Sequence, residues 1–235
     1  MKIEIWSDVL CPFCYIGKRN FETALEQFAY KNDIEVIWKS FQLDPEMPEV
    51  ASESYLDYLV KRKGMSADQV KGMLDNVTHT AKQAGLEYHL EKSVIVNSLN
   101  AHKLIQFAKT KGLGDEMEER LFLAFFKEGG NIANIEALTQ YGKEIGLDEM
   151  ELQAAFTDDN YAYQVKQDIT EAQQIGVRGV PFFVFDRKYA VSGAQPPKAF
   201  LENLEKSFNE WREKNPETKL EVTEGQSCTV DGVCE

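Results

Sequence analysis

The chain has 235 residues, of which 43% are hydrophobic and 28% charged, and its formal net charge is -13. These proportions are typical of a globular protein with one large domain or a domain that carries a sizeable insertion. The acidity argues against nucleic acids and anionic membranes as partners, and no apolar run is long enough to span a bilayer. The N-terminal run MKIEIWSDVL has acidic residues where a secretory signal has an apolar core, which predicts a cytoplasmic location.

The first part of the chain predicts a strand, a helix and a second strand. Residues 2–6 form a strand-like run, residues 15–28 carry apolar side chains at helical spacing, and residues 34–38 alternate between apolar and polar. A crossover of this length is a βαβ unit with parallel strands and a right-handed connection. Pro45 and Pro48 break the pattern and indicate a loop.

Residues 52–175 are predicted to be entirely helical. Glycines that act as stop signals separate the predicted helices, which cover residues 53–63, 67–84, 98–111, 115–127, 135–145, 150–156 and 160–175. Side chains suited to cap the N-termini of these helices are Ser66, Asp115, Asn134, Asp148 and Asp158.

Strand patterns return after the helical block. Residues 181–185 and 189–192 flank Asp186-Arg187-Lys188 and predict a hairpin, and residues 197–214 predict a final helix. This order of elements predicts an α/β protein with a thioredoxin-like fold and a large all-helical insertion. We assign residues 1–48 and 176–215 to the thioredoxin-like domain, 49–175 to the helical insertion and 216–235 to a polar tail.

The run Cys11-Pro12-Phe13-Cys14 places two thiols on one turn at the start of the first helix. Free backbone N–H groups and the helix dipole stabilise a negative charge there, which favours the thiolate form of Cys11. We therefore expect an exposed Cys11 to attack a substrate disulfide and Cys14 to resolve the mixed disulfide. Pro12 suits the first helical position, and it and Phe13 are candidate modulators. Half of a zinc site and an inert buried pair are the weaker interpretations, since zinc needs two more ligands.

Three polar side chains near these segments have a structural and a functional interpretation. Asp8 either relays a proton and modulates the thiol pair or, as we favour, caps the loop into the first helix. Asn97 is expected to cap a helix entry. His102 is expected to be a core or interface histidine rather than a catalyst.

Several motifs resemble those of DsbA-family oxidoreductases of the FrnE-like branch. They are WSDVLCPFCYIG at residues 6–17, NSLNAH at 97–102, GVRGVPFFV at 176–184 and VSGAQ at 191–195. The similarity covers about residues 2–208 and implies a DsbA-like fold that catalyses protein dithiol–disulfide exchange. It also implies that Val180-Pro181 is a cis-proline loop beside the two cysteines, where the Val180 backbone binds substrate.

Cys228 and Cys234 lie in the tail and flank an Asp231-Gly232 turn signal. A turn there would bring the two thiols together as a second redox pair. The alternative is a tail with two incidental thiols, and both interpretations stay open.

The leading hypothesis is a cytoplasmic protein dithiol–disulfide oxidoreductase that acts as a reductase or isomerase on disulfide-containing proteins or peptides. It needs no prosthetic cofactor or metal, and glutathione is a candidate reductant. A glutathione-dependent isomerase or transferase of the same fold is the first alternative, although such relatives typically carry serine where this chain has Cys11. A redox-sensing or chaperone-like binding module is the second. The recycling reductant and the oligomeric state stay open.

Overall fold

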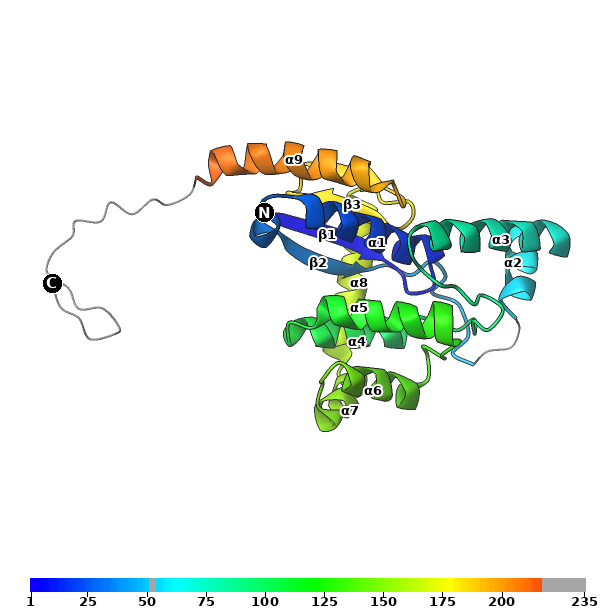
Figure 1. Cartoon of the computed structure of the whole chain (residues 1–235). Helices are drawn as coiled ribbons and strands as arrows, with labels where there is room; N and C mark the ends of the chain where they lie inside the picture. Colours follow the sequence, from blue (N-terminus) through cyan, green and yellow to red (C-terminus); the bar gives the residue numbers. More distant parts are fainter. Residues whose placement is uncertain (51–53, 217–235) are drawn as a thin grey trace, which may run out of the picture.

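A computed structural model describes residues 1–50 and 54–216 (Figure 1). Its centre is a four-stranded sheet in the order β2-β1-β3-β4. Strand β1 (Lys2–Ser7) pairs in parallel with β2 (Glu35–Ser40) and antiparallel with β3 (Phe182–Phe185). Strand β3 continues through a hairpin into β4 (Tyr189–Ser192). The predicted parallel βαβ unit and the predicted hairpin are both confirmed.

Alternate side chains of β1 enter two different cores, as the two-residue period of a strand requires. Ile3 and Ile5 belong to the larger core, together with Phe21 of α1 (Pro12–Gln27). The final helix α9 (Pro197–Lys214) packs alongside α1. Trp6 faces the smaller core with Ala172 of α8 (Asp159–Gln174). Figure 1 shows α9 on one side of the sheet and α4 to α7 on the other.

The segment between β2 and β3 forms the helical block that the sequence predicts. After the short 3-10 turn η1 (Lys31–Asp33) and β2, its elements are α2 (Tyr55–Lys63), α3 (Ala67–Gln83), α4 (Leu99–Thr110), α5 (Gly114–Leu123), the π-helical turn η2 (Ala124–Glu128), α6 (Ile135–Glu144), α7 (Glu149–Thr157) and α8. The fold is therefore thioredoxin-like with a large helical insertion. Helices α2 and α3 project at one end of the sheet, next to the start of α1 (Figure 1).

Most of the predicted helix caps are confirmed, and one is wrong. The side chains of Ser66, Asn134, Asp148 and Asp158 each accept a backbone N–H at the start of a helix. Asp115 does not cap α5, which follows Leu113. Its carboxylate instead accepts the Trp38 indole N–H at 2.8 Å and lies 3.3 Å from the Lys18 ammonium. The Asp115 carboxylate thus binds residues from distant parts of the chain and is not available to cap α5.

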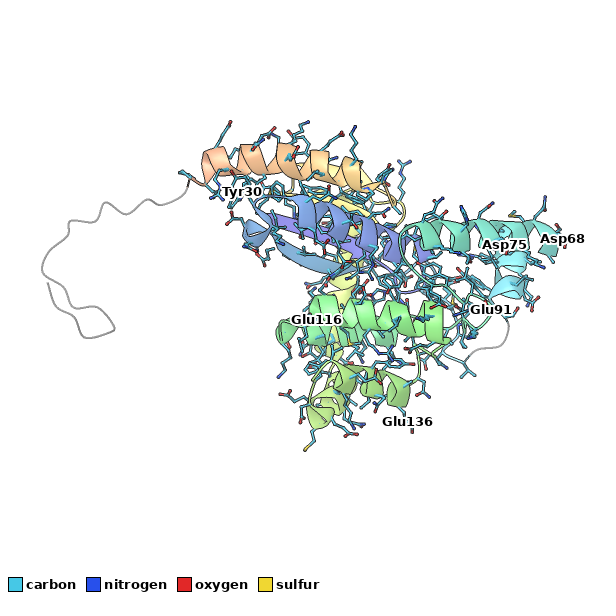
Figure 2. All side chains as sticks on the ribbon, viewed as in Figure 1. Tyr30, Asp68, Asp75, Glu91, Glu116 and Glu136 are labelled. Atoms are coloured by element: carbon cyan, nitrogen blue, oxygen red, sulfur yellow. The ribbon has the colours of Figure 1, made fainter. Side chains whose placement is uncertain are left out.

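The surface accounts for the acidity of the chain. Figure 2 labels five exposed acidic side chains, Asp68, Asp75, Glu91, Glu116 and Glu136.

Within residues 1–50 and 54–216, no helix has the length and apolar character that a bilayer crossing needs. The predicted tail pair, Cys228 and Cys234, lies outside the described residues.

Candidate active site

The two thiols of the motif lie on the first turn of α1. Cys11 is the N-cap residue, in an extended backbone conformation, and Pro12 follows at the first helical position. The Cys14 N–H donates to the Cys11 carbonyl at 2.9 Å, and the Cys11 N–H donates to the Asp8 carbonyl at the same distance. Both cysteines are free thiols.

The expectation that Cys11 is exposed is wrong. Only 5% of its surface is exposed, against 1% for Cys14, and Phe13 is the solvent-facing residue of the motif at 42%. Cys11 is covered because two distant segments approach it. Its thiol donates to the Val180 carbonyl at 3.4 Å, and Tyr88 of the insertion donates to the Pro12 carbonyl at 2.7 Å. Cys11 thus lies between the proline loop and the insertion.

The Val180–Pro181 peptide bond is cis, as predicted. The loop lies directly against α1, where a Cβ atom on Gly17 would be 2.9 Å from Pro181 Cγ and 3.3 Å from the Phe183 ring. Only a residue without a side chain permits this approach. Gly17, which the sequence analysis did not single out, is therefore needed to bring the loop to Cys11.

The environment of Cys14 opposes its ionisation. Burial raises the pKa of the Cys14 thiol well above its ordinary value, and the hydrogen bond and charge of Cys11 raise it further. Two groups lower the pKa of Cys14, because a backbone N–H of Asp8 and the hydroxyl of Ser7 favour the thiolate. The surroundings of Cys14 therefore favour its protonated thiol form.

A buried carboxyl group from the insertion is hydrogen-bonded to Ser7. Ser7 Oγ donates to Glu118 Oε1 of α5 at 2.6 Å, and the two residues are 2% and 1% exposed. Burial raises the pKa of Glu118 to about 7, although the hydrogen bond from Ser7 and the nearby His102 and Lys18 lower it.

The sequence analysis missed Glu118 because it lies in the charged run DEMEER, which is typical of a solvated helix face. Its position in the helical repeat could have identified Glu118 as a buried residue. Leu121 and Phe122 follow three and four residues later, which places Glu118 on the apolar side of α5. Glu116, two residues earlier, points to solvent (Figure 2).

Asp8 orders the loops around the motif. Its Oδ1 accepts the Leu10 N–H at 3.2 Å and its Oδ2 accepts the Leu43 N–H at 2.7 Å. This is the loop-capping arrangement that the sequence favours. His102 Nε2 lies 3.4 Å from Asp8 Oδ1. Burial works against its protonation, but the hydrogen bond and charge of Asp8 leave the pKa of His102 raised overall.

Asn97 joins the same loop to the helical insertion. Its Oδ1 accepts the Leu99 N–H at the entry to α4, as predicted. Its Nδ2 also donates to the carbonyls of Pro45 and Met47, each at 2.9 Å. Asn97 therefore fixes the segment that follows β2 against the start of α4.

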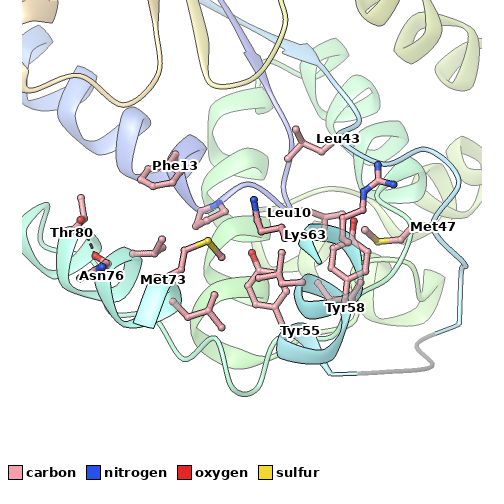
Figure 3. Close-up of a pocket in the computed structure, with 16 residues that line it drawn as sticks. Leu10, Phe13, Leu43, Met47, Tyr55, Tyr58, Lys63, Met73, Asn76 and Thr80 are labelled. Atoms are coloured by element: carbon pink, nitrogen blue, oxygen red, sulfur yellow. Dashed lines mark hydrogen bonds between the residues drawn. The ribbon is translucent and has the colours of Figure 1, made fainter. Parts of the chain in front are cut away.

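An apolar cavity of about 480 Å³ opens beside the motif (Figure 3). Residues of the motif form one wall, and α2 and α3 of the insertion form the opposite wall. Its lining includes Leu10, Pro12, Phe13, Leu43, Met47, Tyr55, Tyr58, Leu59, Met73 and Val77. Arg62 and Lys63 add positive charge to the lining. The part of the chain that the structure covers gathers no group of three or more His, Cys, Asp or Glu side chains suited to a metal ion.

The comparisons with known proteins agree with this architecture. Residues 2–205 match the DSBA-like thioredoxin domain family. A probable DsbA oxidoreductase from Streptomyces coelicolor is 34% identical, superposes with a TM-score of 0.84, and the match covers 100% of this chain and 98% of that one. YwbO, an uncharacterized protein of Bacillus subtilis (strain 168), is 28% identical over 183 residues, which are 77% of this chain and 85% of YwbO.

A third relative shares the fold at lower identity. The cytosolic disulfide reductase DsbM of Pseudomonas aeruginosa, in a structure with GSH, is 17% identical with a TM-score of 0.66, over 89% of this chain and 100% of DsbM. The FrnE-like branch stays a prediction from the motifs. With its family match across 204 of 235 positions and its thioredoxin-like fold, the chain belongs to the DSBA-like thioredoxin domain family.

Proposed function

We propose that the protein is a dithiol–disulfide oxidoreductase that uses Cys11 as nucleophile and Cys14 as resolving thiol. The observation that carries this proposal is the arrangement at the start of α1. The Cys11 thiol is at the N-cap, 3.4 Å from the Val180 carbonyl, and Cys14 is buried one turn behind it. The N-terminus of a helix is a general site for a negative charge, because its first backbone N–H groups have no partner within the helix.

The reaction consists of two thiol–disulfide exchanges. The Cys11 thiolate attacks one sulfur of the substrate disulfide, the substrate S–S bond breaks, and the leaving sulfur takes up a proton. Cys14 then loses its proton and attacks Cys11 Sγ, which releases the second substrate thiol and leaves a Cys11–Cys14 disulfide. Two electrons pass from the enzyme to the substrate, and two molecules of glutathione are the proposed source that restores the dithiol. Isomerisation follows when a substrate thiol, instead of Cys14, attacks the mixed disulfide.

The proposed substrates are polypeptides with an accessible disulfide. The backbone of Val180 next to Pro181 offers hydrogen-bonding groups to an extended chain, in the manner of an added strand. The cavity beside Phe13 then receives an apolar side chain of the same polypeptide. Arg62 and Lys63 in its lining would favour segments with an acidic residue nearby.

Reduction of insulin disulfides tests the proposal. The parent protein is expected to accelerate the reduction, and Cys11→Ser is expected to abolish the acceleration. Cys14→Ser is expected to retain the first exchange and to accumulate a mixed disulfide with the insulin chain, which intact-mass spectrometry detects. Turnover that persists in Cys11→Ser would contradict the proposal. Insulin binding without turnover in the parent would indicate the redox-sensing or chaperone-like alternative.

Two further variants test the remaining alternatives. Turnover of a small-molecule isomerisation substrate by Cys14→Ser in the presence of glutathione would favour the glutathione-dependent isomerase. The double variant Cys228→Ser, Cys234→Ser tests the tail. A second redox centre there predicts a shifted redox potential or slower turnover, whereas incidental thiols predict no change. The proposed cytoplasmic setting is tested by fractionation of cells that produce the protein.

A further inference from the structure

We propose that Glu118 of the helical insertion exchanges the proton of the resolving thiol through the hydroxyl of Ser7. This inference rests on the proposed function, because it concerns the step in which Cys14 resolves the mixed disulfide. Ser7 is the hydroxyl that lowers the pKa of the resolving thiol. Glu118 acts through Ser7 and is a positioning residue for the transferred proton.

Ser7 stands between the thiol and the carboxylate. Its hydroxyl lowers the pKa of Cys14 and donates to Glu118 Oε1 at 2.6 Å. A distance of that length between a hydroxyl and a carboxylate is typical of a charge-assisted hydrogen bond. Cys14, Ser7 and Glu118 are at most 2% exposed. Bulk water therefore does not reach the Cys14 thiol, and the path through Ser7 replaces it.

The other carboxylate near the motif is oriented differently. Asp8 reaches Cys14 with its backbone N–H. Its two carboxylate oxygens accept the backbone N–H groups of Leu10 and Leu43. Those bonds hold the loops in place, so among the described side chains Glu118 is the carboxylate linked to the Cys14 sulfur through a hydroxyl.

The ionisation behaviour of the pair fits this role. Burial raises the pKa of Glu118 to about 7, so the group takes up and returns a proton near neutrality. The ionisable groups that face Glu118 come from three helices: Lys18 of α1, His102 and Lys109 of α4, and Asp115 of α5. The positive groups lower its pKa, and Asp115 raises it.

The resolving step begins with a concerted transfer of two protons. The Cys14 S–H proton passes to Ser7 Oγ while the Ser7 hydroxyl proton passes to the Glu118 carboxylate. The resulting Cys14 thiolate attacks Cys11 Sγ, the bond between Cys11 and the substrate sulfur breaks, and the substrate leaves as a thiolate. When a reductant opens the Cys11–Cys14 disulfide, the neutral Glu118 returns its proton to the departing Cys14 sulfur by the same path.

The two exchanges are separated by stopped-flow reaction with dithiobis(nitrobenzoate), which releases one coloured thiolate when Cys11 attacks and a second when Cys14 resolves. The full-length chain carries Cys228→Ser and Cys234→Ser, so only Cys11 and Cys14 react. In this background, Glu118→Gln is expected to slow the second release at least about tenfold at pH 7. It is also expected to remove the inflection near pH 7 from the pH profile of that step and to leave the first release unchanged.

Further variants separate loss of the proton path from a general disturbance of the fold. Ser7→Ala breaks the path while Glu118 stays in place, and it is expected to slow the second release to the same extent. The double variant is expected to be no slower than either single variant, because both act in one path. Glu116→Gln makes the same chemical change at the exposed position on α5 (Figure 2) and is expected to behave like the parent.

The outcomes distinguish the two proposals. An absent first release in the parent contradicts the proposed function itself. A normal first release, with a second release that keeps the parent rate and pH profile in both Glu118→Gln and Ser7→Ala, overturns only the proton path.

Discussion

Lys18 and Glu118 are ionisable residues buried in the interior, and the protein accommodates them differently. Burying an isolated charge is costly, so it must be paired or neutralised. Lys18 is 2% exposed and has the carboxylates of Glu22, Asp115 and Glu119 within 3.3 Å. Their charges outweigh the effect of burial and raise the pKa of Lys18, so it stays charged. Glu118 has a serine partner instead, and a raised pKa allows it to be neutral.

This difference predicts how stability depends on pH. Raising the pKa of Glu118 from its ordinary 4.5 to about 7 means that folding favours its protonated form. The folded state therefore loses stability as the pH rises from 4.5 through 7, by roughly 3 kcal/mol. Glu118→Gln removes this dependence. Its free energy of unfolding, relative to the parent, is expected to increase between pH 5 and pH 8 in urea titrations. A constant difference across that range would contradict the assignment.

The close contact between Gly17 of α1 and the proline loop predicts that a substitution at Gly17 lowers stability and slows disulfide reduction. Gly17→Ala places a methyl group 2.9 Å from Pro181 Cγ, so the loop must move or α1 must shift. We expect a loss of about 1–3 kcal/mol in the free energy of unfolding and slower disulfide reduction. The matched control is Gly72→Ala in α3, where a Cβ would meet nothing within 4 Å. That change is expected to stabilise the helix by about 0.5–1 kcal/mol. Equal effects of the two substitutions on unfolding would argue against the close contact.

At the scale of elements, an aromatic stack joins the insertion to the first helix. Tyr15 of α1 stacks on Phe122 of α5 with ring centroids 4.9 Å apart. Tyr88, in the loop before α4, stacks on Phe126 of the π-helical turn at 4.7 Å. The π-helical turn leaves the Phe126 carbonyl free to accept the His89 N–H, which holds the loop of Tyr88 in place. The insertion is thereby fixed against the Cys-x-x-Cys turn.

Removing one hydroxyl from this contact tests its role. Tyr88→Phe keeps the ring but loses the hydrogen bond to the Pro12 carbonyl, and it is expected to lower the free energy of unfolding by about 1 kcal/mol. Because the loop also covers Cys11, alkylation of Cys11 is expected to become faster. Tyr163→Phe is the control, since Tyr163 is 60% exposed on α8. If Tyr88→Phe matched this control in both stability and alkylation rate, the burial of Cys11 would not depend on the hydrogen bond between Tyr88 and the Pro12 carbonyl.

The order and type of the elements could be predicted from the sequence, because hydrophobic periodicity and caps are local signals. The absence of a cap at Asp115 could not be predicted in this way, since its actual partners, Trp38 and Lys18, are distant in sequence. The burial of Cys11 was missed for the same reason, because the segments that cover it come from the insertion and the proline loop. Local pattern identified the thiol pair, whereas its cover and its buried carboxyl neighbour depend on tertiary contacts.

At the scale of the whole molecule, the site is assembled from three separate parts of the chain. The thioredoxin-like part contributes the thiols and the cis-proline loop. The insertion contributes Glu118, which is hydrogen-bonded to Ser7, through α5, and one wall of the apolar cavity beside the motif, through α2 and α3. Under the proposed function, the insertion supports the proton transfer through α5 and polypeptide binding through α2 and α3, which predicts that the two respond to different substitutions.

Met73 of α3 lines the cavity opposite the motif (Figure 3). Met73→Lys places a charge among apolar side chains there, so an apolar residue of a polypeptide substrate would lose its favourable contact. We expect kcat/KM for insulin reduction to fall at least about tenfold, mainly through KM, because one buried apolar side chain contributes roughly 1.5–3 kcal/mol. The reaction of Cys11 with dithiobis(nitrobenzoate) is expected to stay at the parent rate, since that small disulfide does not need the cavity. Met150→Lys makes the same change on α7, where Met150 is 82% exposed, and is expected to affect neither reaction. A parallel loss in both reactions for Met73→Lys would mean that the substitution disturbs the thiols, and unchanged insulin reduction would mean that the cavity does not bind the polypeptide.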